Sequence, residues 1–282
     1  MNIEFENDFL KGVRREHQAT KNTAKFEDID NAKMPDTIVI HYTAGRDAET
    51  SAKYLADPKV EASAHLVIGR DGTIFQLASF KHITWHAGVS HYQDRKGLNK
   101  YSIGIELDNA GPLIKTGNVY KSWFGGTYSE DQVVFATHRN ENQPRYWHTY
   151  TEVQISVCEE ICRALIEKYG ITKILGHEEI SVGRKTDPGP AFQLDRFREH
   201  LLSHNRKTDD EKSVSFKEGM VITDKLNIRA DAGANFPLVA MPLKEGHDVE
   251  VLEEANGWYK VETKITGWVN KAYIGPKKNG KP

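Results

Sequence analysis

The stretch from Leu175 to Phe192 holds a histidine, a lysine and an aspartate in one turn-rich segment, LGHEEISVGRKTDPGPAF. The run Pro188-Gly189-Pro190 follows Asp187 at once, and a helix interior cannot contain that run, so Asp187 must lie on a loop or at a helix entrance. A rigid polar loop of this kind could bind a metal ion through His177 and Asp187. Taken alone, the stretch is equally consistent with a surface turn that carries a solvated ion pair.

Residues elsewhere in the chain would complete a hydrolytic metal site. His41, His177 and Asp187 offer two imidazoles and one carboxylate, and zinc in hydrolytic sites binds three protein ligands and keeps a fourth position for water. The pKa of such a water falls to about 7, so hydroxide forms at neutral pH and could open an amide. Glu106 is our candidate to take the proton of that water and pass it to the leaving amine. Lys185, on the same loop as Asp187, could stabilise negative charge on the carbonyl oxygen.

From spacing alone this set is not unique, because the chain has 12 histidines and 40 acidic residues. For the other histidines the default interpretation is a surface or hydrogen-bonded side chain, with His65 and His86 as candidates to line the site. Trp85 and Asn109 are further candidates for contact with a substrate.

Two strand-like runs must position His41 and Glu106. Residues 37–40, TIVI, are a β-branched run that ends at His41, which places this imidazole at the C-terminal end of a buried strand. Residues 102–107 alternate between apolar side chains on one face and Gly104 and Glu106 on the other. The alternative for Glu106 is a solvated position on an edge strand. Because Gly104 leaves room for a ligand to approach the carboxylate, we favour the functional interpretation.

The rest of the first 204 residues is predicted to contain further helices and strands. Helices are expected at 48–56 with Asp47 as N-cap, from Thr151 to just before Gly170 with Gln154 in the capping-box position, and at 193–204. Strands are expected at 63–69 and 73–78, joined at Asp71-Gly72, and at 171–175. A short helix and a wrapping arm are expected over residues 1–35. Residues 110–149 are expected to form an irregular but ordered excursion.

Beyond this region the composition changes. Residues 203–215, SHNRKTDDEKSVS, are polar and charged, which is typical of a linker. Short β runs follow, and Asn256-Gly257 between two of them is a strong hairpin signal. We therefore expect a catalytic domain at 1–205 with its core at 35–204, a linker at 206–216, a small all-β barrel at 217–276 and a basic tail at 277–282.

Composition and charge exclude several classes of function. The chain of 282 residues has 38% hydrophobic and 28% charged residues, which is ordinary for a globular protein. Its net charge of -2 gives no overall electrostatic attraction to nucleic acid or to an acidic membrane surface. No run is long enough to span a bilayer, and the N-terminus lacks the features of a signal peptide. We expect a soluble chain made in the cytoplasm, which would need another delivery route to act beyond the inner membrane.

The two cysteines, Cys158 and Cys162, lie four residues apart on an expected helix. This spacing favours their interpretation as small buried residues over a metal-binding or redox pair.

Six blocks occur in the order and spacing of a known family: IVIHYTAG at 38–45, SAHLVIGRDGTIFQL at 63–77, WHAGVS at 85–90, NKYSIGIEL at 99–107, GHEEIS at 176–181 and GRKTDPGPAF at 183–192. Over roughly residues 35–204 the chain resembles the zinc-dependent N-acetylmuramoyl-L-alanine amidases of type 2, relatives of peptidoglycan recognition proteins and phage amidase lysozymes. The resemblance implies an α/β (α+β) domain with a central mixed sheet flanked by helices. It also implies one zinc ion on His41, His177 and Asp187, a catalytic Glu106, and Lys185 at the reacting carbonyl.

The implied reaction is hydrolysis of the amide bond between the lactyl group of N-acetylmuramic acid and the L-alanine of the stem peptide. The C-terminal region resembles a bacterial SH3-like cell-wall module through LNIRADAGANFPLVAMPLKEG, VEVLEEANGWYKVE and TGWVNKAYI. Such modules commonly bind peptidoglycan, which would raise the local substrate concentration. The alternative is that the C-terminal region is a structural appendage or forms a dimer contact. Val60-Glu61 stands where a basic residue could bind a stem-peptide carboxylate, so preference for a diaminopimelate-type stem stays open.

Three functions are consistent with these features. The leading hypothesis is an amidase of endolysin, toxin or remodelling type that cleaves intact peptidoglycan. The second is a cytosolic recycling amidase for soluble anhydro-muropeptides, which the WHAGVS and RKTDPGP blocks resemble most. The third is a non-catalytic peptidoglycan receptor, but such receptors typically lack part of the zinc set, whereas all five positions are present here.

Overall fold

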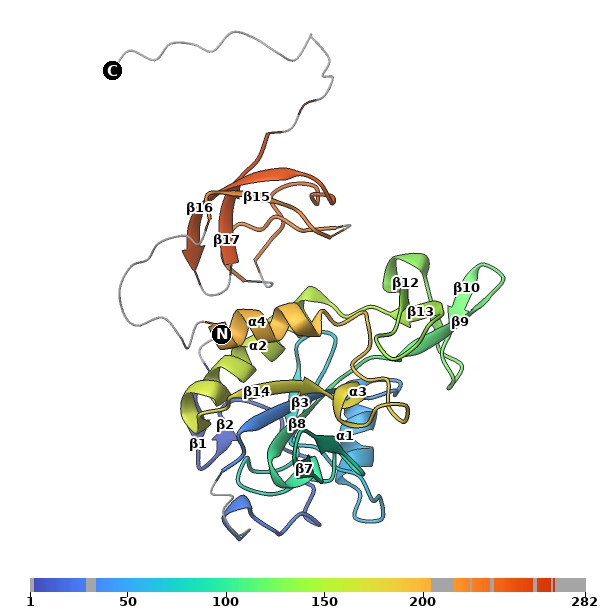
Figure 1. The fold of residues 1–282 in the computed structure, drawn as a ribbon, viewed down its shortest axis with the longest axis vertical. Coiled ribbons are helices and arrows are strands. Elements are labelled where there is room, and N and C mark those ends of the chain that lie inside the picture. The colour runs from blue at the N-terminus through green and yellow to red at the C-terminus, as the bar shows by residue number, and fades with distance from the viewer. Residues whose placement is uncertain are drawn as a thin grey trace. The chain divides into compact units, whose positions relative to one another are not determined.

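The computed structural model describes residues 3–28, 34–203, 216–223, 225–233, 236–255, 258–264 and 266 (Figure 1). The chain forms two compact units, residues 1–208 and 209–282. The predicted linker at 206–216 lies outside the described residues except for Phe216, and so do the predicted tail at 277–282 and the Asn256-Gly257 turn.

A five-stranded sheet in the order β14-β3-β8-β4-β5 forms the centre of the first unit. Its strands are β3 (Thr37–Tyr42), β4 (Leu66–Ile68), β5 (Ile74–Gln76), β8 (Ser102–Leu107) and β14 (Lys173–Gly176). The strands β14, β3, β8 and β4 pair in parallel, whereas β5 is antiparallel to β4. The mixed sheet that the resemblance implied is therefore confirmed.

Two helices, α2 (Glu152–Tyr169) and α4 (Leu194–Ser203), cover one face of this sheet (Figure 1). The core between them includes Ile38, Ile40, Ile103, Ile105, Cys158 and Cys162. Both cysteines are free and fully buried, which confirms their predicted part in the core. On the other side, α1 (Ala48–Ala56) packs against β4 and β5, and the short α3 (His177–Ile180) follows β14.

The helix termini show which capping predictions hold. Asp47 caps α1 by accepting a hydrogen bond from the Thr50 backbone N–H at 2.7 Å. The Thr151 hydroxyl caps α2 in the same way, and Gly170 ends that helix at φ 68°. The second half of the predicted capping box is wrong, because the Gln154 side-chain amide donates to the carbonyls of Ile68 and Asp108 at 3.0 Å each. Gln154 therefore ties α2 to the ends of β4 and β8 instead of capping it.

The N-terminal arm contains no helix of the expected kind in residues 3–28. Instead, β1 (Phe5–Glu6) pairs with β2 (Phe9–Leu10) in a tight ribbon, and one 3-10 turn lies at Phe26–Asp28. The two residues between the strands, Asn7 and Asp8, both adopt positive φ, which short polar side chains tolerate at such turns. The arm does wrap the domain as predicted, since its backbone bonds to Ile74, Leu77 and Lys81.

A second five-stranded sheet, in the order β11-β10-β9-β13-β12, forms where we predicted an irregular excursion. Its strands are antiparallel and comprise β9 (Pro112–Thr116), β10 (Val119–Lys121), β11 (Thr127–Tyr128), β12 (Val133–Thr137) and β13 (Pro144–His148). The prediction of irregular structure is wrong because large apolar and aromatic residues pair across these short strands: Tyr146 lies opposite both Leu113 and Phe135.

Short elements complete the first unit: β6 (His91–Tyr92) pairs with β7 (Arg95–Lys96), and 3-10 turns lie at Leu98–Lys100 and Glu130–Gln132. In the second unit, β15 (Glu218–Met220), β16 (Asp248–Ala255) and β17 (Trp258–Glu262) form an antiparallel sheet. The prediction of an all-β C-terminal region is confirmed for the residues described there. No helix in the described parts of the chain combines the length and apolar character needed to cross a membrane.

Candidate metal and catalytic site

Three adjacent strand ends bring the candidate residues together. His41 in β3 lies directly opposite Glu106 in β8 in the strand register. On the other side of β3, Gly176 pairs with Ile40, so His177 emerges from β14 beside His41. Because β14, β3 and β8 are parallel, these side chains meet at the carboxyl edge of the sheet, where open α/β sheets bind ligands.

The side chains of His41, His177 and Asp187 converge on one point. The distances are 3.0 Å between the two Nδ1 atoms and 2.9 Å from each Nδ1 to Asp187 Oδ2. All three residues are buried. Tetrahedral zinc with bonds of about 2.0–2.2 Å places its ligand atoms roughly 3.3–3.6 Å apart, so the donor types suit zinc and the three atoms need to separate by only a few tenths of an ångström to bind it.

The outer hydrogen bonds of both histidines fix which nitrogen carries a hydrogen. His177 Nε2 lies 3.2 Å from the Ala87 carbonyl oxygen, which can only accept, so His177 Nδ1 presents a lone pair. His86 Nε2 likewise donates to the Ser102 carbonyl at 3.3 Å, which leaves His86 Nδ1 to accept from His41 Nε2 at 2.9 Å. Both Nδ1 lone pairs therefore face a carboxylate oxygen, and a cation between them removes the repulsion.

Electrostatics keeps this ligand set in the protonation states that metal binding needs. Burial, with the nearby His177, lowers the pKa of His41 to about 4, so this imidazole is neutral at pH 7. Burial acts to raise the pKa of Asp187, but hydrogen bonds from the His177 and His41 side chains, made when these rings carry hydrogen on Nδ1, outweigh it and lower that pKa. When the Nδ1 atoms present lone pairs instead, a cation among the three atoms would keep Asp187 ionised.

Glu106 has the environment of a proton acceptor. It lies on β8 between β3 and β4, so the alternative of a solvated edge position is wrong. Its side chain is buried, and within the described part of the chain its Oε2 has no hydrogen-bond partner. Burial raises the pKa of Glu106 well above its usual value, and the charge of Asp187 adds to that shift. A carboxyl group shifted in this direction suits proton transfer near neutral pH.

Lys185 supplies positive charge at the same edge. It is half-buried, and its backbone N–H bonds to the Ser181 carbonyl at 3.0 Å in the turn that follows α3. Its ammonium charge lowers the pKa of both Glu106 and His41. Lys185 thus lies near enough to influence both groups, and its role at a reacting carbonyl stays a prediction.

The four candidates for substrate contact have different surroundings. His65 is fully buried, with Nε2 donating to the His82 carbonyl at 2.8 Å and Nδ1 accepting from the Gly104 backbone at 3.0 Å. Asn109 is also buried and bonds to the backbone of His148 and Gly111. Both side chains are engaged inside the protein. Trp85, by contrast, is 41% exposed.

His86 occupies the space that Gly104 provides. A Cβ atom at Gly104 would lie only 2.3 Å from His86 Cγ. The prediction that Gly104 makes room for a ligand is therefore wrong, because the imidazole behind His41 fills that room. His86 thus orients the ligand candidate His41 through the hydrogen bond described above, and its side chain is buried.

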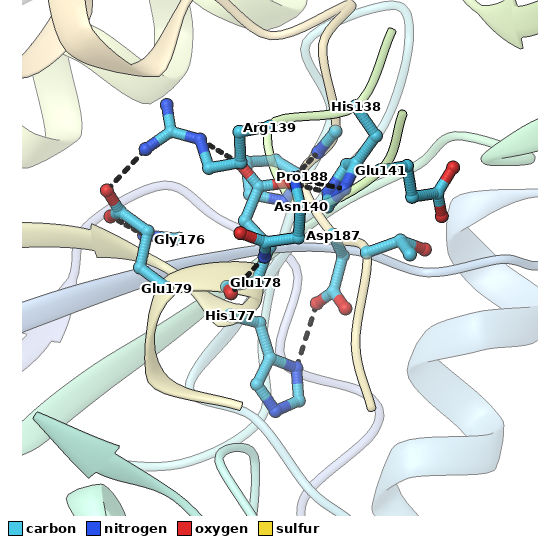
Figure 2. A network of polar contacts seen from close by, with 12 residues as sticks. His138, Arg139, Asn140, Glu141, Gly176, His177, Glu178, Glu179, Asp187 and Pro188 are labelled. Atoms are coloured by element: carbon cyan, nitrogen blue, oxygen red, sulfur yellow. Dashed lines mark hydrogen bonds and ion pairs between the residues drawn. The ribbon is translucent and has the colours of Figure 1, made fainter. Parts of the chain in front are cut away.

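Sequence reasoning missed the residues that lie behind His177 and Asp187. Figure 2 shows Glu178, next to His177, in a network with His138, Arg139 and Asn140, which belong to the turn between β12 and β13. The acidic pair in GHEEIS was the only signal, since the partners lie about 40 residues away along the chain.

Comparison with known proteins gives consistent matches. The family model described as N-acetylmuramoyl-L-alanine amidase matches residues 31–190, and that of the bacterial SH3 domain matches residues 224–275. The 1,6-anhydro-N-acetylmuramyl-L-alanine amidase AmpD of Escherichia coli K12 is 37% identical over 141 residues, which are 49% of this chain and 58% of that protein. The protein of the same name from Salmonella typhimurium SL1344 is 35% identical over 153 residues, covering 53% and 63%.

The chain thus spans only 58% and 63% of the length of these two curated relatives. Among solved structures, the crystal structure of a selenomethionine AmpD derivative is 27% identical with a TM-score of 0.46. That match covers 69% of this chain and 97% of the other.

Proposed function

This chain belongs to the N-acetylmuramoyl-L-alanine amidase family, and from that membership we propose that it hydrolyses the amide bond between N-acetylmuramic acid and the L-alanine of the stem peptide. The observation that supports the proposal most directly is the convergence of His41, His177 and Asp187 beside the buried carboxyl group of Glu106.

We assign one zinc ion to His41 Nδ1, His177 Nδ1 and Asp187 Oδ2, the three atoms whose types and spacing suit it. When bound, zinc supplies Lewis acidity, which lowers the pKa of water to about 7 and polarises a carbonyl group. The hydrogen bonds from His41 to His86 and from His177 to Ala87 keep both rings turned toward the site.

Glu106 and Lys185 act on the reacting groups. Glu106 Oε2, which has no partner in the described part of the protein, accepts a proton from the attacking water and delivers it to the L-alanine nitrogen as the C–N bond breaks. The Lys185 ammonium stabilises the negative charge that grows on the carbonyl oxygen. The products are a free lactyl carboxylate and a stem peptide with a new amino terminus.

The substrate that we favour is intact peptidoglycan, because the bacterial SH3 domain at residues 224–275 could hold the enzyme on a polymer and raise its local concentration there. On this view the protein must reach the cell wall. Soluble anhydro-muropeptides are the second candidate, favoured by the similarity to two amidases named for a 1,6-anhydro substrate. On that view the protein acts in the cytoplasm.

The test supplies the zinc-loaded full chain with purified sacculi and, separately, with soluble anhydro-muropeptides. We expect peptides that begin with L-alanine to appear by mass spectrometry, faster per cleavable bond from sacculi. Faster cleavage of the soluble fragments would support the recycling function. Binding to sacculi without release of peptide would favour the receptor hypothesis and overturn the proposed reaction.

A further inference from the structure

Glu178 is a buried carboxylate held by the second sheet. It follows the metal-ligand candidate His177 directly and is 2% exposed. Its two oxygens accept hydrogen bonds from His138 Nε2 at 2.6 Å, from Arg139 Nε at 2.9 Å and from the Gly189 backbone at 3.0 Å (Figure 2). A buried carboxylate with three donors is fully satisfied, and removal of any donor leaves its charge partly unpaired.

His138 is fixed as the donor in its contact with Glu178. The backbone N–H of Asn140 donates to His138 Nδ1 at 3.2 Å, so Nδ1 carries a lone pair and Nε2 carries the hydrogen. His138 is therefore a neutral donor, and the charge that balances Glu178 comes from Arg139. The ring also stacks on Trp147 of β13, at 5.6 Å between centroids, so it has little freedom to turn.

The same glutamate connects both halves of the proposed zinc site. Its backbone N–H donates to the Asp187 carbonyl at 2.8 Å, and its carboxylate binds the backbone of Gly189 on the same loop. Glu178 thus joins the residue next to His177 to the segment that carries Asp187. Asn140 adds a further bond from the second sheet, to the Glu178 carbonyl at 2.9 Å.

Other residues hold the loop 186–189 from the same side. Tyr150, just after β13, donates to the Pro188 carbonyl at 2.7 Å. Trp147 lies against Gly189, where a Cβ atom would come within 3.1 Å of the indole and where φ is 75°. A larger residue at Gly189 would therefore meet both a steric and a conformational penalty.

We propose that the second sheet is a clamp that fixes the relative positions of His177 and Asp187, with Glu178 and His138 as positioning residues for the metal. The proposal rests on the proposed function in taking the ion to be zinc. A buried ion pair is a weak source of stability compared with apolar packing. The geometry of this one, which joins two metal-ligand segments, points to orientation of the ligands as its role.

The test measures zinc affinity of the full chain by chelator competition, with no substrate present. His138→Leu removes the donor to Glu178, and we expect zinc affinity to fall about 10- to 100-fold. His138→Gln can still donate from a similar position and should stay within about threefold of wild type. His91→Leu, on the exposed strand β6, is the matched control and should bind zinc as wild type does.

A second readout separates positioning from general stability. With cobalt in place of zinc, a displaced ligand changes the absorption bands of the tetrahedral ion, so His138→Leu should alter the spectrum whereas His91→Leu should not. Unchanged affinity and spectrum in His138→Leu would overturn the clamp. A wild-type protein that binds zinc through this site but cleaves no amide would instead overturn the proposed function and leave the clamp standing.

Discussion

Glu106 lies directly opposite His41 in the pairing of β8 with β3, on the same face of the central sheet. Adjacent strands are about 4.8 Å apart, so backbone hydrogen bonds rather than a loop set the distance between the backbones of the proposed proton acceptor and of a metal-ligand candidate.

Glu106→Gln should abolish most of the activity while sparing the fold. The amide is nearly the same size but cannot accept a proton, so we expect kcat to fall about 100- to 10,000-fold. Zinc affinity should change little, because Glu106 is not among the three ligand candidates. Glu167→Gln, on the exposed side of α2, is the matched control. An unchanged rate in Glu106→Gln would show that another group moves the proton.

Lys185→Met should lower kcat about 100- to 1,000-fold through loss of charge stabilisation at the carbonyl oxygen. It should also change the pH profile. Since the ammonium group lowers the pKa of Glu106, its removal raises that pKa, and the acid limb of kcat/KM should move to higher pH. The profile of Lys59→Met, an exposed lysine after α1, should match that of wild type. A shift toward lower pH would contradict the assignment.

Removal of the metal should destabilise the first unit. Zinc at 100 times its dissociation constant stabilises the folded state by about 2.7 kcal/mol, so a chelator should lower Tm measurably. Asp187→Ala should lower the Tm of the zinc-containing protein and make it insensitive to the chelator, and bound zinc should fall from one ion per chain toward none. Equal chelator sensitivity in the two proteins would place the metal elsewhere.

Gly104→Ala tests the packing of His86 behind His41. The new methyl group would overlap the imidazole, so we expect a loss of about 1–3 kcal/mol in unfolding free energy and weaker zinc binding. Adding His86→Ala removes the overlap and should restore much of the stability but not the zinc affinity, because His41 still lacks its acceptor. Additive stability losses in the double variant would contradict this packing.

Features encoded by residues close together in the chain could be predicted from the sequence, whereas features that depend on contacts between distant residues could not. The residues 37–41 and 102–106 carry their strand signals locally, and the structure places His41 and Glu106 where those signals predict. The short strands β9 and β13 stabilise each other by pairing, although about 30 residues separate them in the sequence. A short stretch of sequence therefore does not predict either strand.

The side chains that surround the site could not be predicted for the same reason, because their partners lie far away along the chain. Gly104 was expected to leave room for a ligand, but the space beside it is filled by His86, from a loop 18 residues earlier. Likewise, nothing near Gln154 indicates that its side chain bonds to the ends of β4 and β8. Residue types identified the ligand candidates, whereas the contacts that orient them required the tertiary structure.

Asp108 gives a pH-dependent test of stability. Burial raises its pKa to about 6, so folding favours the protonated form and the ionised form lowers stability at higher pH. The cost approaches about 3 kcal/mol above pH 6 and declines as the pH falls toward 3.8. Asp108→Asn should therefore raise the free energy of unfolding at pH 8, and the gain at pH 5 should be about half as large. Denaturant titrations at the two pH values measure both gains. A larger gain at pH 5 than at pH 8 would reverse the assigned direction.

The burial of Cys158 and Cys162 has a practical consequence. They are the two cysteines of the whole sequence, and neither has exposed surface. Burial also raises the pKa of Cys162 well above that of a free thiol, so little reactive thiolate forms there. A single cysteine introduced at an exposed position such as Val89 would be the one thiol that a maleimide dye reaches under native conditions. The natural chain already serves as a background for site-specific fluorescent labelling.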